Sequence, residues 1–183
     1  PNVTLVGILA ADMSLYADDY RAGERTFQLL TQAAGRAGRG NKKGEVVVQT
    51  YSPEHYAIET ASRQDYDAFY SEELAYRKLM GYPPAEELLA ILVEGTNETL
   101  LETACTYLKN YAERVGRNEV QLIGPASPYV GKVNDVYRKV IYLRHPQYKV
   151  LTSMKDKMEQ YIEMNSGFAS LRIQFDFNPM NIF

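Results

Sequence analysis

Apolar residues in the N-terminal part of the chain predict a strand, a helix and a second strand. The run Val3–Leu9 is mostly apolar and rich in β-branched residues, which is typical of a strand buried on both faces. Apolar residues at helical spacing follow from Ala22, and the poor helix formers Gly35 and Gly38 predict that this helix ends near them. Glu45–Tyr51 predicts the second strand. This order predicts a parallel βαβ unit, which cannot bury both faces of its sheet alone, so we expect it to end a larger domain.

Residues 53–80 predict a helical connection. Ser52 and Pro53 are typical of an N-cap and a first helical residue, and Asp65 is a candidate cap for a second helix. In that second helix one apolar stripe is expected to face the core, and it consists of Tyr66, Phe69, Tyr70 and Leu74. The sequence Gly81–Pro84 then stops the helix and predicts a domain boundary.

The remaining residues, 81–183, predict strands and helices in the order β-α-β-β-α-β. The predicted strands are 88–94, 119–123, 137–143 and 171–177, and the predicted helices are 97–115 and 147–164. This order is the split βαβ arrangement of a ferredoxin-like α+β sandwich. The fold class predicted for the chain is therefore an α/β unit followed by an α+β domain.

Composition narrows the classes of protein that are possible. Of the 183 residues, 45% are hydrophobic and 23% are charged, which is ordinary for a globular protein. No apolar run is long enough to span a bilayer, and no membrane partner is expected. The single cysteine, Cys105, excludes an internal disulfide, and with only His55 and His145 beside it no metal site is predicted. We therefore expect a reducing, cytoplasmic setting.

Charge is unevenly distributed along the chain. The net charge of −3 excludes an attraction of the whole chain to nucleic acid, so such binding would need a local patch. Residues 128–157 hold two acidic and seven basic side chains, the latter being Lys132, Arg138, Lys139, Arg144, Lys149, Lys155 and Lys157. One interpretation is a solvated face. The other is a site for an acidic partner, either DNA backbone or an acidic protein tail, with contacts from Lys132, Arg138, Arg144, Lys149 and Lys155.

The most specific local motif is Gln32–Arg39, which reads QAAGRAGR. Gln32, Arg36 and Arg39 stand at i, i+4 and i+7, on one face of a helix that ends there. Only small residues separate them, so a neighbouring lobe could approach closely while the long side chains reach across. Guanidinium groups offer forked donors to phosphate oxygens, which suits a triphosphate. The alternative is an ordinary helix end, where arginine is favoured by the negative pole of the helix.

This motif resembles motif VI of superfamily 2 helicases. The surrounding sequence is similar to the C-terminal third of the primosomal protein N′ (PriA) family. The segments that carry this similarity are VTLVGILAAD, RAGERTFQLLTQAAGRAGRG, GEVVVQTYSPEHYAI, DYDAFYSEELAYRKLMGYPP, GPASPYVGKVNDVYR and RIQFDFNP. The similarity runs from Val3 to about Pro179. Members of this family are ATP-dependent 3′–5′ DNA helicases that restart stalled replication forks and support primosome assembly.

The resemblance implies a division of the chain and a role for each part. Residues 1–52 would be the end of the second RecA-like helicase lobe, 53–80 the helical connection, and 81–183 the C-terminal domain. That domain helps family members to bind branched DNA and the single-stranded-DNA-binding protein. Gln32, Arg36 and Arg39 match the positions that face ATP bound on the first lobe, and Gly35 and Gly38 match the glycines beside the nucleotide.

Several family features are missing from these residues. There is no phosphate-binding loop of the form G-x-x-x-x-G-K-S/T, no acidic Walker B run and no cysteine-rich zinc insertion. We therefore expect ATP, Mg²⁺ and zinc to be held upstream of Pro1 in a longer parent protein, and no cofactor in this chain. The chain itself should be competent for binding but unable to hydrolyse ATP.

Two classes of function stay open. The first is a piece of a helicase, with DNA forks, single-stranded DNA, the single-stranded-DNA-binding protein and other primosome proteins as partners. The second is a non-catalytic protein- or DNA-binding module. A free-standing enzyme is poorly supported, because no nucleophile–base pair or metal cluster is visible. Apolar strands that lack sheet neighbours also predict that the chain self-associates.

Overall fold

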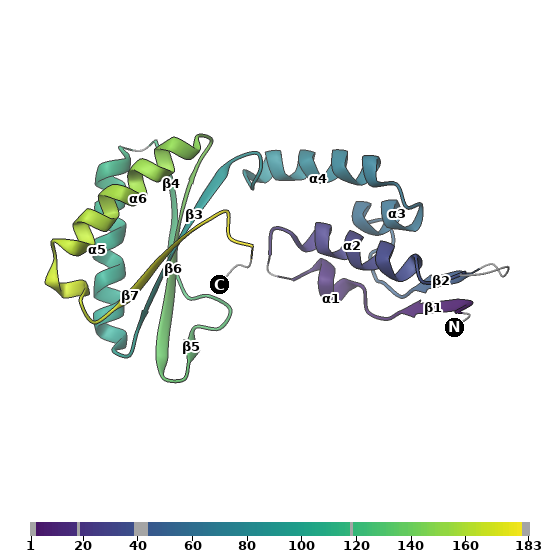
Figure 1. Cartoon of the computed structure of the whole chain (residues 1–183), viewed down its shortest axis with the longest axis horizontal. Coiled ribbons are helices and arrows are strands. Elements are labelled where there is room, and N and C mark those ends of the chain that lie inside the picture. Colours follow the sequence, from purple (N-terminus) through teal and green to yellow (C-terminus); the bar gives the residue numbers. More distant parts are fainter. Residues whose placement is uncertain (1–2, 18, 39–43, 118, 181–183) are drawn as a thin grey trace. The chain divides into compact units, whose positions relative to one another are not determined.

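The chain forms two compact units, Pro1–Met80 and Gly81–Phe183. The computed structural model describes residues 3–17, 19–38, 44–117 and 119–180. Figure 1 shows a small sheet with several helices in the first unit, and two long helices against a larger sheet in the second. Each unit has its own cluster of buried apolar side chains.

The first unit is built around two parallel strands, as the sequence predicts. These strands are β1 (Leu5–Ile8) and β2 (Glu45–Val48), and Val6 pairs with Val46. The helices of this unit are α1 (Asp12–Leu15), α2 (Ala22–Ala34), α3 (Tyr56–Ser62) and α4 (Tyr66–Met80). Its core contains Phe27 and Leu30 of α2, which pack with residues of the other three helices.

The prediction that the first strand is buried on both faces is wrong for the residues that the structure describes. Side chains of β1 and β2 alternate between half-buried and exposed positions, and Leu5 and Val47 are 60% and 53% exposed. A continuous apolar run does not reveal how many layers cover a sheet, and in this unit the helices cover one face.

Two details of the helical connection also differ from the prediction. The helix expected to begin at Pro53 begins at Tyr56, because His55 is its N-cap and accepts a hydrogen bond from the Ala57 N–H through Nδ1. In α4 the buried residues are Phe69, Glu73 and Arg77, whereas Tyr66 and Tyr70 of the predicted stripe are exposed. The predicted cap by Asp65 is confirmed, since its carboxylate accepts the Ala68 N–H at 3.0 Å.

The second unit has the predicted element order with one added strand. Its elements are β3 (Glu87–Gly95), α5 (Glu98–Gly116), β4 (Gln121–Ala126), β5 (Lys132–Val133), β6 (Val136–His145), α6 (Tyr148–Glu163), a short 3₁₀ helix (Ser166–Phe168) and β7 (Arg172–Phe177). The antiparallel sheet has the order β4-β6-β3-β7, and β5 pairs with β6. The strand predicted over 119–123 begins instead at Gln121 and continues to Ala126 through a register shift.

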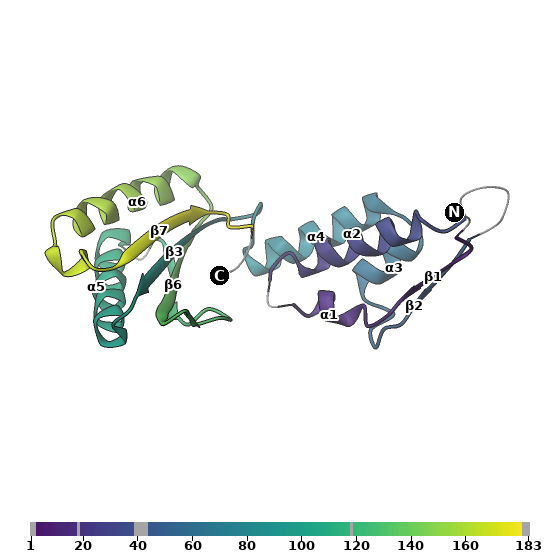
Figure 2. The same ribbon diagram turned by 60° about the horizontal axis from the view of Figure 1, so that its bottom comes forward.

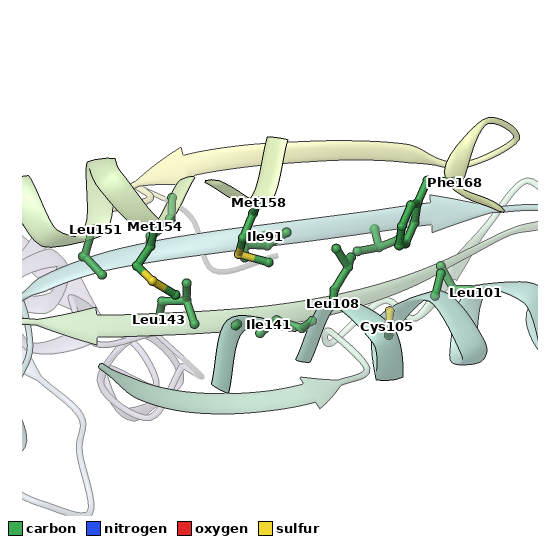
Figure 3. Packing of buried hydrophobic residues seen from close by; sticks show 14 residues of the cluster. Ile91, Leu101, Cys105, Leu108, Ile141, Leu143, Leu151, Met154, Met158 and Phe168 are labelled. Atoms are coloured by element: carbon green, nitrogen blue, oxygen red, sulfur yellow. The ribbon is translucent and has the colours of Figure 1, made fainter. Parts of the chain in front are cut away.

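Helices α5 and α6 cover one face of this sheet (Figures 1 and 2). Ile91 of β3 and Ile141 of β6 point toward Leu108 of α5 and Met158 of α6 (Figure 3). Cys105 is fully buried in this cluster, and burial raises the pKa of its thiol to about 12. The β5 hairpin lies on the other side of the sheet (Figure 1).

Candidate functional site

The C-terminal end of α2 presents the residues of the arginine motif. Gln32 lies in the last turn of the helix and Arg36 lies in the turn that follows, and both side chains are exposed. The Arg36 N–H donates to the Ala33 carbonyl at 3.1 Å, but no hydrogen bond or ion pair joins the Arg36 side chain to any other residue in the described ranges. Its guanidinium group is therefore available for an anion. Arg39, the third residue of the motif, lies outside the described residues.

Glycines shape the turn that carries Arg36. Gly35 is the C-cap of α2 and donates its N–H to the Thr31 carbonyl at 3.0 Å. Gly38 has a φ of 77° and donates its N–H to the Val3 carbonyl, which ties the turn to the strand region. A Cβ on Gly44 would lie 2.2 Å from the Gly38 nitrogen, so this approach requires glycine.

Asp12 fixes the chain beyond β2. Its carboxylate accepts hydrogen bonds from the Thr50 hydroxyl at 2.8 Å and from the Tyr51 N–H at 3.0 Å. Burial by itself would raise the pKa of Asp12, but these bonds outweigh burial and hold the pKa below its ordinary value. The first strand–helix junction is therefore tied to the end of the second strand.

A group of buried polar side chains, which we call the Arg77 network, joins α2 to α3 and α4. Arg77 pairs with Glu73 at 2.7 Å and with Glu24 of α2 at 2.8 Å, and the Tyr56 hydroxyl donates to Glu73 at 2.7 Å. A Cβ on Gly23 would lie 2.8 Å from both the Glu73 carboxylate and the Tyr56 hydroxyl. The sequence analysis missed this network, although Glu73 and Arg77 stand at the i, i+4 spacing of a helical ion pair.

The surroundings of these groups shift their pKa values. Burial by itself would raise the pKa of Glu24, but hydrogen bonds from Arg21 and Arg77 hold it below its ordinary value of 4.5. Burial and the bond to Glu73 raise the pKa of the Tyr56 hydroxyl. The network therefore holds an ionised Glu24 carboxylate and a neutral Tyr56 hydroxyl at neutral pH. It fixes the first turn of α2, the helix whose other end presents Gln32 and Arg36.

The predicted basic residues of the second unit are mostly paired with carboxylates. Lys132 pairs with Asp135, an acid of the same stretch. The other ion pairs are Arg138 with Glu94, Arg144 with Glu86 and Lys155 with Glu159. Three of these four acids lie outside residues 128–157, which is why the local count overstated the positive charge. Lys149 is exposed and makes no ion pair within the described part of the chain.

Arg144 and Arg138 lie on the sheet face that α5 and α6 leave uncovered, but they do not form one cluster. Arg144 donates to the Gly81 carbonyl at 3.0 Å and to Gln121 at 3.0 Å, so it holds the segment before β3 against the sheet. Arg138 lies six residues earlier on β6, roughly 20 Å away along an extended strand. As the alternation predicts, Lys139 points to the helical face, where it pairs with Glu102 of α5 at 2.8 Å.

The described residues contain neither a membrane-spanning helix nor a cluster of metal ligands. None of their helices is long and apolar enough to cross a membrane. No group of three or more His, Cys, Asp or Glu side chains among them is arranged to hold a metal ion.

Comparison with known proteins identifies the class of the second unit. Residues 78–180 match the family described as primosomal protein N C-terminal domain, and this match covers more than half of the chain. The chain therefore belongs to the primosomal protein N C-terminal domain family.

Longer relatives extend the similarity to the first unit. The chain is 35% identical over 179 residues to replication restart protein PriA of Bacillus subtilis, 33% identical over 181 residues to that of Synechocystis, and 33% identical over 183 residues to that of Haemophilus influenzae. These matches cover 98–100% of this chain but only 22%, 21% and 25% of the respective relatives. Among solved structures, the de novo designed protein Foldit4 matches 52% of the chain at 10% identity with a TM-score of 0.41.

Proposed function

We propose that this chain is the C-terminal part of an ATP-dependent 3′–5′ DNA helicase that restarts stalled replication forks and supports primosome assembly. The observation that carries the proposal is the exposed end of α2, where Gln32 and Arg36 have no competing carboxylate partner in the described ranges. Family membership and the similarity to replication restart proteins support it.

The fold assignments belong to the same proposal. The parallel pair β1–β2, with α2 between its strands in the sequence, supports residues 1–52 as the end of a RecA-like lobe. In the second unit, the sheet order β7-β3-β6-β4 with both helices on one face supports a ferredoxin-like sandwich. Residues 53–80 would connect the two.

In this proposal Gln32, Arg36 and Arg39 act on ATP held by the first lobe of the parent protein. Arginine donors stabilise charge that develops on the transferred phosphoryl group, and Gly35 and Gly38 give the nucleotide close access. Mg²⁺ and a zinc site would be held by upstream parts of the parent, so this chain alone would not hydrolyse ATP.

The second unit would bind DNA and protein partners, including the single-stranded-DNA-binding protein and other primosome proteins. Lys132, Lys149 and Lys155 are the accessible candidates among the predicted contacts, because their charges lie at the surface. Arg144 would act indirectly by holding the segment before β3. Arg138 lines a cavity at one end of the sheet.

Strand separation by the full-length protein tests the proposal. We expect ATP-dependent unwinding of a duplex with a 3′ single-stranded tail, and none of a duplex with only a 5′ tail. A duplex without ATP is the matched control. DNA binding without any ATP-dependent strand separation would contradict the helicase proposal and favour the binding-module alternative.

A further inference from the structure

A cavity of about 490 Å³ lies at one end of the second unit's sheet. Its lining comes from the end of β3, from the β5–β6 hairpin and from the segment that leads into β7. The residues are Glu94, Gly95, Thr96, Val133, Asn134, Val136, Arg138, Ser170 and Arg172. We propose that this cavity binds a phosphodiester group of single-stranded DNA, between the guanidinium groups of Arg138 and Arg172. This rests on the proposed function, since it names a DNA contact of the same unit.

The two arginines flank one carboxylate across three neighbouring strands. Glu94 of β3 is the register partner of Arg138 on β6 and of Arg172 on β7. Its carboxylate pairs with Arg138 Nε at 3.2 Å and more loosely with Arg172 Nε at 3.8 Å. The cluster therefore carries one net positive charge, which is the sign required for an anion.

The guanidinium groups have more donors than the surrounding residues use. Two arginines offer ten N–H donors. In the described part of the chain the only acceptor bonded to either guanidinium is the Val130 carbonyl, 3.4 Å from Arg138 Nη1. The Glu94 carboxylate is an ion-pair partner of both arginines, and Arg138 Nε is buried without a hydrogen bond. The Arg138 side chain is only 19% exposed, so its remaining donors face the cavity rather than bulk water.

The two arginines suit different parts of the binding event. Arg138 is held in place by Glu94, so it is oriented before a ligand arrives. Arg172 is 70% exposed and loosely paired, so it can turn toward an anion at little energetic cost. The hydroxyls of Thr96 and Ser170 add neutral donors at the rim, and no hydrogen bond joins either of them to another described residue.

The size and donor set favour a nucleotide unit over a carboxylate side chain. A carboxylate has two oxygens, whereas a phosphodiester has two non-bridging oxygens that share one negative charge and two ester oxygens, which together match forked and hydroxyl donors. The volume is also in the range of small-molecule sites rather than that of a single side chain. The sequence analysis missed Arg172 and Glu94, because neither lies in the stretch 128–157.

Binding of a labelled oligothymidine to the full-length protein, measured over a range of salt concentrations, tests this site. Arg172→Ala should weaken binding about fivefold, the effect of one partly exposed charge contact. It should also reduce the slope of log Kd against log salt by about 0.7, the value for one lost phosphate contact on a single strand. Glu94→Gln should change affinity in the opposite direction and tighten binding, because it removes the charge that repels phosphate.

Arg114→Ala is the matched control, because Arg114 is an exposed arginine of α5, on the helical side of the unit. It should leave affinity and salt slope unchanged, and thermal unfolding should confirm that each variant is folded. The exposed Arg172 variant decides the outcome if Glu94→Gln does not fold.

Three results would overturn the site. If Arg172→Ala behaves like Arg114→Ala while the wild-type protein binds and unwinds DNA, the cavity assignment is wrong and the proposed function stands. If the wild-type protein binds no DNA at all, both are wrong. If Arg172→Ala weakens binding of an acidic peptide but not of oligothymidine, the cavity takes carboxylates and the phosphate assignment is wrong.

Discussion

At the scale of single residues, Arg77 is the side chain on which the first unit most depends. It is nearly buried and sits between two carboxylates, Glu73 of its own helix and Glu24 of α2. Removing one member of a buried ionic group lowers stability more than replacing the whole group by apolar residues, because a buried charge then loses a partner. Here Glu73 would lose its ion pair with Arg77, whereas Glu24 would keep its ion pair with Arg21.

Arg77→Ala should therefore lower the free energy of unfolding of the first unit by about 3–5 kcal/mol. Chemical denaturation of the chain followed by circular dichroism measures this change. Arg63→Ala is the control, because Arg63 forms only an exposed i, i+4 pair with Glu59, and it should lower stability by less than about 1 kcal/mol. Equal effects of the two substitutions would show that the Arg77 network adds no stability.

Glu24 predicts how the first unit responds to acid. Its folded pKa lies below 4.5, so its stabilising contribution is complete above about pH 4.5 and is lost as the pH falls through the folded pKa. Glu24→Gln should therefore flatten the dependence of the unfolding midpoint on pH below 4.5. An acid dependence as steep as that of the wild-type chain would mean that other carboxylates govern it.

At the scale of elements, the long helices of the second unit could be read from the sequence and α4 could not. The apolar periodicity of α5 and α6 matches the residues that they bury, because each helix packs one continuous stripe on a sheet. In α4 the buried face contains the ion pair between Glu73 and Arg77. Arg77 also bonds to Glu24, which lies 53 residues earlier in the chain. Apolar periodicity within a helix cannot reveal such a partner, so it predicts core positions for Tyr66 and Tyr70, which are exposed.

The candidate sites also differ in whether local sequence or contacts between distant segments determine them. The spacing of Gln32 and Arg36 within one motif is local information, and the structure brings these two residues to one helix end. The ion pairs of Arg138 and Arg144 depend on strand register between distant segments, so the sequence overstated the free charge of the stretch 128–157.

The β1–β2 pair predicts self-association of the chain. Its two strands pair with each other, and its exposed face carries Leu5 and Val47. Apolar strands with open edges add further strands from other copies. Light scattering at tens of micromolar should therefore show species larger than a monomer, and the double substitution Leu5→Lys with Val47→Lys should reduce them. Tyr107→Ser on α5, an exposed position of the other unit, is the control. A monomeric wild-type chain would contradict this prediction.

At the scale of the whole molecule, the two units carry different parts of the proposed activity. In the proposal, the first unit presents an arginine for a nucleotide held elsewhere in the parent protein, and the second offers basic side chains and a nucleotide-sized cavity for DNA. Each unit has its own apolar core, so a substitution that damages one role should leave the other unit folded. This independence allows ATP turnover and DNA binding to be tested separately.

The most direct test is the rate of ATP hydrolysis by the full-length protein carrying Arg36→Ala, measured at saturating single-stranded DNA. The account predicts a fall of roughly 10³-fold, the effect of losing an arginine that stabilises phosphoryl transfer, with DNA affinity unchanged. Arg63→Ala should retain the wild-type rate. A wild-type rate for Arg36→Ala would contradict the central claim that this end of α2 acts on ATP.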